Sequence, residues 1–404
     1  MKEIHGGVCA PKGFQASGVH CGIRKNKNKK DLALIVSDVM CHSASVYTLN
    51  KVKGAPIFVT KNHLNNHEAK AIICNSGNAN TCNSNGIEIA NEVCELCAKE
   101  LNIDASDIII ASTGVIGEPL NIEPFSKHMK NLVEQLNVHG SDDAAHAIMT
   151  TDTSKKECAV EFMLHNQTCH IGAIAKGSGM IHPNMATMLS FITTDVNISK
   201  DLLDQVLHEV VNDTFNMVSV DGDTSTNDMV SILANGLAKN PMIIDTGSDY
   251  QIFKEALLSV CIHLAREIAS DGEGATKLIT CHVMNAKTIK DAKIISKSVI
   301  TSSLVKAAMF GKDANWGRIL CAIGYSEAEY NVNLIDVHIK SQAGEICVCK
   351  QGMGIVFSEE KALDILQEDE IIIDIDLHMG SQNAKAWGCD LTYDYVKING
   401  DYRT

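Results

Sequence analysis

The sequence predicts an α/β protein built from two domains. Short apolar runs rich in β-branched residues alternate with segments whose apolar residues recur at helical spacing, which indicates sheets covered by helices. At 404 residues the chain exceeds the roughly 250 to 300 residues at which a single hydrophobic core stops growing. Its apolar share of 45% and charged share of 21% are ordinary for a globular protein, so we expect packed cores throughout.

The expected elements follow from these patterns in chain order. Strands are predicted where aliphatic and β-branched residues run together, at Leu32–Val36, Ile57–Thr60, Ala71–Cys74, Ile108–Ala111, Ala159–Leu164, Ile171–Ala175 and Met188–Thr193. Helices are predicted at Ile87–Leu101, Glu123–Leu136, Lys200–Phe215 and Tyr250–Ala269. Ser199 stands directly before the third helix and is its expected N-cap.

The pattern changes after about Leu278. Strands become longer and alternate more strictly, at Val332–Ile339 and Ile371–Leu377, with a helix near Glu360–Gln367. We therefore expect a main α/β domain over residues 1–277 and a second α/β domain over residues 278–404. No low-complexity linker separates them, so we expect the two to pack closely.

Charge and targeting signals narrow the class of function. A formal charge of −14 argues against a nucleic-acid or anionic-membrane surface, which would need clustered Lys and Arg. The one basic run, from Arg24 to Lys30, is expected to be a solvated loop, with a partner contact as the alternative. The start of the chain has no secretory signal, and no stretch has the roughly 18 apolar residues that cross a bilayer. We expect a cytoplasmic protein, or an organellar one if a presequence is missing.

The cysteines predict packing rather than disulfides or metal. Fifteen cysteines without a repeating framework indicate reduced thiols, and an odd number cannot all pair. Cys94 and Cys97 form a C-x-x-C, but they share the apolar face of the predicted Ile87–Leu101 helix. We expect both to lie in the core.

Four segments are dense in glycine and small polar residues, as loops that build sites usually are. They are Asn75–Asn80, Ser112–Gly117, Lys176–Leu189 and Ser270–Lys277. Any one of them alone could equally be a turn. Thr187 begins a new apolar strand in the third segment, and by pattern alone it reads as an ordinary β-branched strand residue.

The order of these motifs along the chain is more specific than any one of them. The chain contains, over its length, GGVCAPKGF, NSGNAN, ASTGVIGEPL, MTTDT, GSGMIHPNMATML, VDGDTSTND, SDGEGATK, NWGR and NGDYRT. It closely resembles the ornithine acetyltransferase (glutamate N-acetyltransferase) family from Gly6 to Thr404. The resemblance implies a layered α/β/β/α sandwich of the Ntn-hydrolase type, with a second, smaller α/β domain.

The resemblance also implies a self-cleaving enzyme of arginine biosynthesis. Its precursor would break between Ala186 and Thr187, giving chains 1–186 and 187–404. Thr187 would then be the nucleophile, activated by its own new α-amino group, which titrates near 7.7 to 8.0 rather than the roughly 10.4 of a lysine. The Thr113 side chain and the Gly114 backbone N–H would form the oxyanion hole.

The implied reaction moves an acetyl group from N-acetylornithine to glutamate through an acetyl-threonine. The residues implied to hold substrate are Lys176, Glu273, Asn399, Thr404, Thr187 itself and Thr150, with Thr151 and Thr153 left open in place of Thr150. No cofactor is expected, and acetyl-coenzyme A stays open as a second donor. Assembly as an α2β2 heterotetramer is implied as well.

Alternative interpretations of the metal content and of the function stay open. Asp221, Asp223 and Asp228 suggest a metal site, but their spacing fits a hydrogen-bonded loop equally well and the family's chemistry needs no metal, so we expect none. A self-cleaving amidase or aminopeptidase, or an uncut non-catalytic binding protein, are the alternative functions. One departure from the family pattern, Ala314 in DANWGR where Pro is usual, touches no proposed catalytic residue.

Overall fold

The computed structural model describes residues 1–182 and 188–401. The chain divides into two compact units, which are described separately. Unit 1 comprises Met1–Gly177, Pro183–Phe215 and Thr224–Leu264, and unit 2 comprises Ser178–His182, Asn216–Asp223 and Ala265–Thr404. The boundary at 277/278 and the processed chains 1–186 and 187–404 stay predictions.

The described part of unit 1 contains one nine-stranded sheet of order β1-β6-β7-β8-β10-β3-β4-β5, with β2 paired to β3. Its strands are β1 (Lys2–Ile4), β2 (Phe14–Val19), β3 (Leu32–Tyr47), β4 (Glu68–Asn78), β5 (Ile108–Val115), β6 (Lys156–Leu164), β7 (Gln167–Lys176), β8 (Leu189–Thr194) and β10 (Met229–Ala234). The predicted strands at β3 to β8 are confirmed. Strand β3 extends to Tyr47, well beyond the predicted end at Val36.

Strand β3 joins two halves of this sheet. Its first part, Leu32–Val36, lies between β2 and β4, and its last part, His42–Tyr47, pairs with β10. The pairing register with β4 shifts between Val36 and Cys41. One buried cluster contains residues of both halves, among them Ile72 of β4 and Phe191 of β8, so the two halves contribute to one hydrophobic core.

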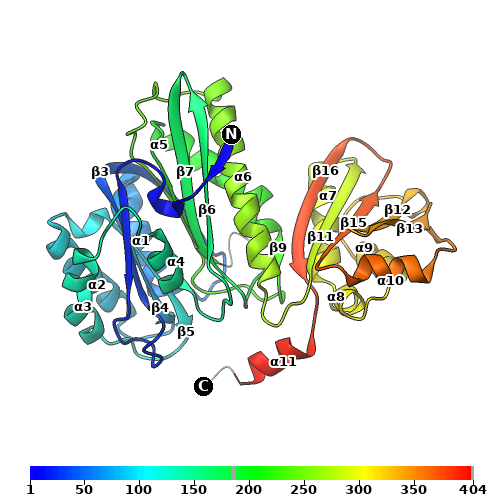
Figure 1. Ribbon diagram of the computed structural model, residues 1–404, viewed down its shortest axis with the longest axis horizontal. Coiled ribbons are helices and arrows are strands. Elements are labelled where there is room, and N and C mark those ends of the chain that lie inside the picture. Colours follow the sequence, from blue (N-terminus) through cyan, green and yellow to red (C-terminus); the bar gives the residue numbers. More distant parts are fainter. Residues whose placement is uncertain (183–187, 402–404) are drawn as a thin grey trace. The chain divides into compact units, whose positions relative to one another are not determined.

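Both faces of the β3-β4-β5 half are buried, in alternation along each strand. In β4, Ile72 and Cys74 belong to the inner cluster, whereas Ala71 and Ile73 belong to an outer cluster with α2 and α3. The helices of unit 1 are α1 (Ala55–His63), α2 (Gly86–Leu101), α3 (Glu123–Glu134), α4 (Ser141–Ile148), α5 (Lys200–Asp213) and most of α6 (Ser248–Ser270). Figure 1 shows α2 and α3 outside β4 and β5, and α6 on the side of β6. The predicted layered α/β fold class is confirmed.

The helices at α2, α3, α5 and α6 match the predictions, and Cys94 and Cys97 are buried in the outer cluster as expected. The strand predicted at Ile57–Thr60 is wrong, because these residues lie in α1. Pro56 stands in the first turn of α1, where its missing N–H costs nothing. A four-residue apolar run cannot by itself distinguish a buried strand from a buried helix segment.

Unit 2 is a second α/β unit, with one sheet and packed helices. Its described strands form a seven-stranded sheet of order β14-β13-β12-β15-β11-β16-β9: β9 (Val218–Ser219), β11 (Leu278–Ala286), β12 (Asp336–Ser341), β13 (Gly344–Lys350), β14 (Met353–Gly354), β15 (Glu370–Asp376) and β16 (Gln382–Cys389). Its helices are α7 (Ile289–Thr301), α8 (Ser303–Phe310), α9 (Trp316–Gly324), α10 (Glu359–Gln367) and α11 (Tyr393–Gly400). Helix α7 packs on β11 and β16, and α10 packs on β12 and β13.

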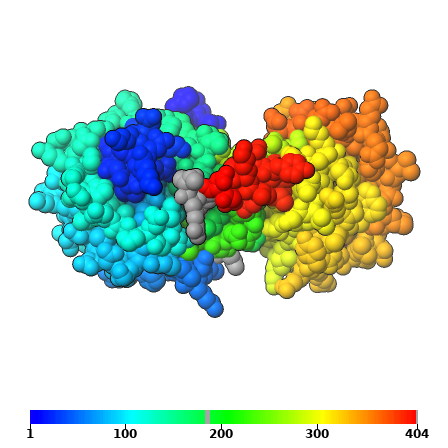
Figure 2. Space-filling model, turned by 90° about the horizontal axis from the view of Figure 1, so that it is seen from below, coloured from blue at the N-terminus to red at the C-terminus, as the bar shows by residue number. Residues whose placement is uncertain are grey.

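Two details of unit 2 bear on the predictions and on the site. The predicted strand Val332–Ile339 begins as a short 3-10 turn, and β12 starts only at Asp336. Helix α11 has no buried residue, and Figure 2 shows it at the surface near the end of the described chain. Within residues 1–182 and 188–401, the structure has no helix that is both long and apolar enough to span a membrane.

Candidate active site

The ends of β4 and β5 meet in a close backbone contact around Gly114. These parallel strands pair Gly77 with Gly114, and the register shifts at Asn78. Gly114 has a φ of +131°, and a Cβ there would lie 2.4 Å from the carbonyl carbon of Gly77 and 2.6 Å from the nitrogen of Asn78. Only glycine fits this position, so the residue after Thr113 is fixed by the fold itself.

A buried network of side-chain amides and hydroxyls ties this strand end to the segment before β10. Asn227 Nδ2 donates to the carbonyl oxygens of Ala79 (2.5 Å) and Ser112 (3.0 Å). Thr81 Oγ1 donates to Asn227 Oδ1 (2.6 Å), and Ser112 Oγ donates to Asn75 Oδ1 (2.6 Å). The NSGNAN, STGVIG and STND motifs therefore act as one hydrogen-bonded structure.

Lys176 brings a buried cation to the same place. It is the last residue of β7, it is 7% exposed, and its Nζ donates to Thr113 Oγ1 at 3.4 Å. Burial lowers the pKa of Lys176, while the nearby charge of Asp152 acts in the opposite direction. A lysine ammonium beside the Thr113 hydroxyl can stabilise negative charge that develops there.

A buried ion pair between Asp152 and Lys156 lies near Lys176. The carboxylate of Asp152 contacts Lys156 Nζ at 2.8 Å, and both side chains are 0% exposed. The same carboxylate accepts from the backbone N–H groups of Gly177 (2.7 Å) and Thr150 (2.8 Å). Burial alone would raise the pKa of Asp152, but the charges of Lys176 and Lys156 outweigh it and hold the pKa below its usual range. Asp152 thus fixes Thr150 on one side and the residue after Lys176 on the other.

A second group of candidate residues is built within unit 2. Asn399 of α11 donates from Nδ2 to Glu273 Oε2 at 2.8 Å, and the Glu273 N–H donates to the Ser178 carbonyl at 3.0 Å. A Cβ on Gly179 would lie about 2.5 Å from the Glu273 carboxylate, so this carboxylate needs glycine beside it. Glu273 is 7% exposed, so its carboxyl group is buried, and a carboxylate is the group that pairs with an ammonium group.

The segment that leads toward the predicted cleavage site is anchored by Asp221. Its carboxylate accepts from the backbone N–H groups of Met180 (2.6 Å) and Ile181 (2.9 Å). Burial raises the pKa of Asp221 against these hydrogen bonds. Within residues 1–182 and 188–401, no three His, Cys, Asp or Glu side chains are grouped so as to hold a metal ion.

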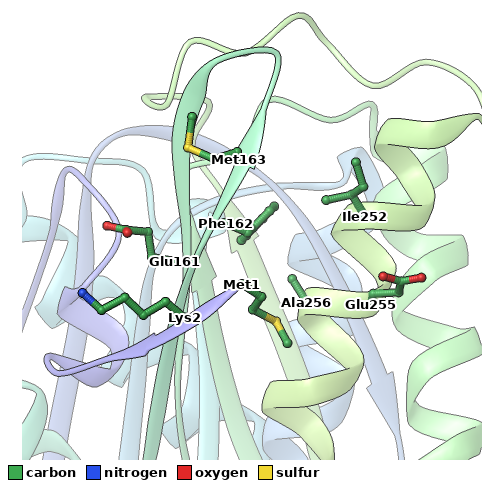
Figure 3. Close-up of a pocket in the computed structure, with 8 residues that line it drawn as sticks. All are labelled: Met1, Lys2, Glu161, Phe162, Met163, Ile252, Glu255 and Ala256. Carbon is green, nitrogen blue, oxygen red and sulfur yellow. The ribbon is translucent and has the colours of Figure 1, made fainter.

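A cavity lies elsewhere in unit 1, away from the candidate residues. Its volume is about 400 Å³, and Figure 3 shows its walls on β1, β6 and α6, with Phe162 facing Ile252 and Ala256. None of the residues that line it is a candidate site residue. Size alone does not mark the candidate chemistry in this structure.

Comparison with known proteins decides the family. The model of the ArgJ family matches residues 15–404. The chain belongs to the ArgJ family. The arginine biosynthesis bifunctional protein ArgJ 1 of Clostridium acetobutylicum is 51% identical over 97% of this chain and 96% of its own length. The ArgJ protein of Caldanaerobacter subterraneus subsp. tengcongensis is 48% identical over the full length of both. A crystal structure of ArgJ from Bacillus halodurans matches with a TM-score of 0.51 and 50% identity, over 53% of this chain and 99% of that one.

Within this ArgJ-family chain, the structure brings the predicted residues together as two groups. Thr113, Gly114, Lys176 and Thr150 lie in unit 1, where Lys176 contacts Thr113 and Asp152 contacts Thr150. Glu273 and Asn399 are in contact within unit 2. Ala186, Thr187 and Thr404 lie outside the described residues. Of the two alternatives to Thr150, Thr151 is half-buried and Thr153 is exposed.

Sequence reasoning missed the residues that support this ArgJ-family site. Asp152 lies in the MTTDT motif and Lys156 begins β6, so no helix joins them and their spacing of four residues gave no signal of the ion pair. The sequence predicts a solvated loop for the basic run that contains Arg24, but Arg24 is half-buried and its Nη2 donates to the carbonyl of Met149, next to Thr150. Its position depends on Asp31, whose carboxylate accepts from the Arg24 N–H at 2.9 Å.

Proposed function

We propose that this chain is a glutamate N-acetyltransferase of arginine biosynthesis, which cuts itself between Ala186 and Thr187 and then uses Thr187 as its nucleophile. The observation that carries the proposal is the full-length membership of the ArgJ family combined with the Thr113, Gly114 and Lys176 arrangement. The structure of unit 1 supports an acyl-transfer site, because it holds hydroxyl, backbone and ammonium donors together at the ends of β5 and β7.

In the proposed cycle, Thr187 attacks the acetamide carbonyl of N-acetylornithine. Its α-amino group takes the hydroxyl proton and later delivers a proton to the departing ornithine amine. The glutamate amine then attacks the acetyl-threonine, and N-acetylglutamate leaves. Each step passes through an oxyanion, for which Thr113 and the Gly114 N–H are the proposed donors, each worth about 2.7 to 4 kcal/mol in a well-studied case.

The proposed substrate contacts are charged side chains. Lys176 is the proposed partner of a carboxylate or acetyl oxygen, and Glu273, held by Asn399, is the proposed partner of the amino-acid ammonium group. Thr150 and Thr404 complete the set. The assembly is proposed to be an α2β2 heterotetramer that works in the cytoplasm without a cofactor.

The test is an assay of the purified, processed protein with N-acetylornithine and glutamate. We expect ornithine and N-acetylglutamate in equal amounts. Release of free acetate without N-acetylglutamate would favour the amidase alternative, and no turnover of an uncut chain would favour the binding protein. Relatives are named bifunctional, so the assay is repeated with acetyl-coenzyme A as the sole donor.

A further inference from the structure

A small cavity within unit 2 is not used by the proposed cycle. Its volume is about 170 Å³, and its lining includes the segment 219–222, the start of α8 and the first turn of α11. All of the lining residues belong to unit 2, and none of them is a proposed catalytic or substrate-binding residue. Drug-sized pockets span roughly 300 to 1,000 Å³, so this cavity is suited to a smaller ligand.

Lys306 of α8 brings a buried ammonium group to the wall of this cavity. The residue is 4% exposed, and its Nζ donates to the Cys389 carbonyl and lies 3.5 Å from Cys389 Sγ. No carboxylate of the described residues forms an ion pair with this nitrogen, in contrast to the buried Asp152–Lys156 pair of unit 1. A buried charge without a counter-ion is costly, so the Lys306 ammonium favours a ligand that carries a negative charge.

Two hydroxyl groups of the same lining are available to a ligand. Neither the Ser303 hydroxyl nor the Tyr395 hydroxyl hydrogen-bonds to another residue that the structure describes. Ser303 lies three residues before Lys306 in α8, so the two side chains lie on the same face of the helix. A hydroxyl can donate to an anion, and Ser303 and Lys306 can therefore bind the same carboxylate.

Asp221 adds a carboxylate to the cavity lining and limits which anion can bind. It accepts from the backbone N–H groups of Met180 (2.6 Å), Ile181 (2.9 Å) and Asp223 (3.1 Å). A carboxylate has about four lone-pair sites, so these three bonds leave room for one more donor. Asp221 would repel a multiply charged anion such as phosphate, whereas the ammonium group of a zwitterion would be attracted to it.

We propose that this cavity binds a small free α-amino acid, with its carboxylate at Lys306 and Ser303 and its ammonium group at Asp221. The site is separate from the proposed substrate contacts, and the proposal does not depend on acetyl transfer. Tyr395 and Asn399 lie about one turn apart in α11, and Asn399 donates to Glu273. An amino acid in the cavity therefore contacts the helix that holds the Glu273 carboxylate.

The test measures binding of isotope-labelled L-alanine to the purified protein by equilibrium dialysis, in wild type, Lys306→Met and Lys277→Met. Lys277 is the matched control, a buried lysine of unit 2 whose Nζ donates to the carbonyls of Gln367 (3.3 Å) and Glu368 (2.8 Å). It does not line the cavity. We expect Lys306→Met to weaken binding by about 10- to 100-fold, the usual effect of losing a hydrogen bond to a charged group. Lys277→Met should bind L-alanine nearly as wild type does.

Acetate and inorganic phosphate test the two charges of the proposed ligand separately. We expect L-alanine to bind more tightly than acetate, because acetate has no ammonium group for Asp221. Acetate that binds as tightly as L-alanine would contradict the role of Asp221. Phosphate that binds more tightly than L-alanine would make the cavity an anion site and overturn the proposal of an amino acid.

Glu273→Gln determines which site holds the probe, since a glutamine keeps an acceptor for Asn399 but removes the proposed partner of the substrate ammonium group. We expect L-alanine binding to persist in this variant. Loss of binding would place the probe at the proposed substrate contacts, which would overturn the inference and leave the proposed function standing. If Lys306→Met does not fold, a crystal structure of the wild-type protein soaked in L-alanine decides. Density for the amino acid at Lys306 is expected, and an empty cavity would refute the site.

Discussion

At the residue scale, burial and neighbouring charges set the pKa values of the buried carboxyl groups near the candidate site. Asp152 and Lys156 form a fully buried ion pair, and the same carboxylate ties the Thr150 segment to the end of β7. Removing one partner from a buried pair is far more costly than removing a surface charge, because the other charge stays buried.

We therefore predict that Asp152→Asn lowers the free energy of unfolding by about 3 to 5 kcal/mol at pH 7, measured by urea denaturation. Because the pKa of Asp152 is depressed in the folded chain, its contribution is complete above the unfolded value near 3.9 and is lost as pH falls below it. The variant should lose less stability than wild type between pH 5 and pH 3. Asp142→Asn, which removes the exposed partner of Lys155, is the control and should cost about 0 to 1 kcal/mol. Equal losses in the two variants would contradict this account.

Gly114 gives a second prediction at this scale. Gly114→Ala should reduce acetyl transfer by about 10²- to 10³-fold, because the added Cβ would displace the backbone N–H proposed as an oxyanion donor. Gly117→Ala is the matched control, since Gly117 also has a positive φ, of +80°, but no atom lies within 4 Å of its added Cβ. It should keep nearly wild-type transfer rates in a steady-state assay. Similar rates for both variants would remove Gly114 from the proposed oxyanion hole.

At the element scale, a residue at the N-cap position need not be a working cap. Ser199 precedes α5 as predicted, but its side chain makes no capping hydrogen bond. Thr288 precedes α7, and its Oγ1 accepts from the Asp291 N–H at 3.1 Å. Capping depends on side-chain rotation and local contacts that residue type alone does not specify.

We predict that Thr288→Ala destabilises α7 by about 1 kcal/mol, whereas Ser199→Ala changes α5 by only a few tenths. Amide hydrogen exchange of the first turn of each helix measures this locally. Exchange should become faster at the start of α7 and stay nearly unchanged at the start of α5. Faster exchange in α5 alone would contradict the assignment of the caps.

The elements also show where sequence patterns suffice. The long periodic segments at α2, α5 and α6 were predictable because each repeats its apolar face over several turns. Ile57–Thr60 was not, because four apolar residues fit a strand or a helix and only the packing of α1 decides. Strand β2 and helix α4 were not predicted. Both contain buried polar residues, such as Ser17 and Ser141, which interrupt the apolar pattern that predicts a core element.

At the scale of the whole molecule, the order of motifs was more informative than any of them alone. Thr113, Lys176 and Glu273 were selected by family resemblance, and no spacing in the sequence links Lys176 to Thr113 across 63 positions. The ionised state of Asp152 and the buried state of Asp228 arise only when distant segments pack together, so sequence patterns could not reveal them. The candidate residues are shared between two units, and their joint action stays part of the proposal.

The central claim is that Thr187 becomes an N-terminal residue and carries the acetyl group. The most direct measurement is the mass of each fragment after the purified protein is incubated with N-acetylornithine in the absence of glutamate. We predict a fragment that begins at Thr187 and has gained one acetyl group on that threonine, which is lost when glutamate is added. A chain that stays whole, or a Thr187→Ala protein that still takes up the acetyl group, would contradict the account.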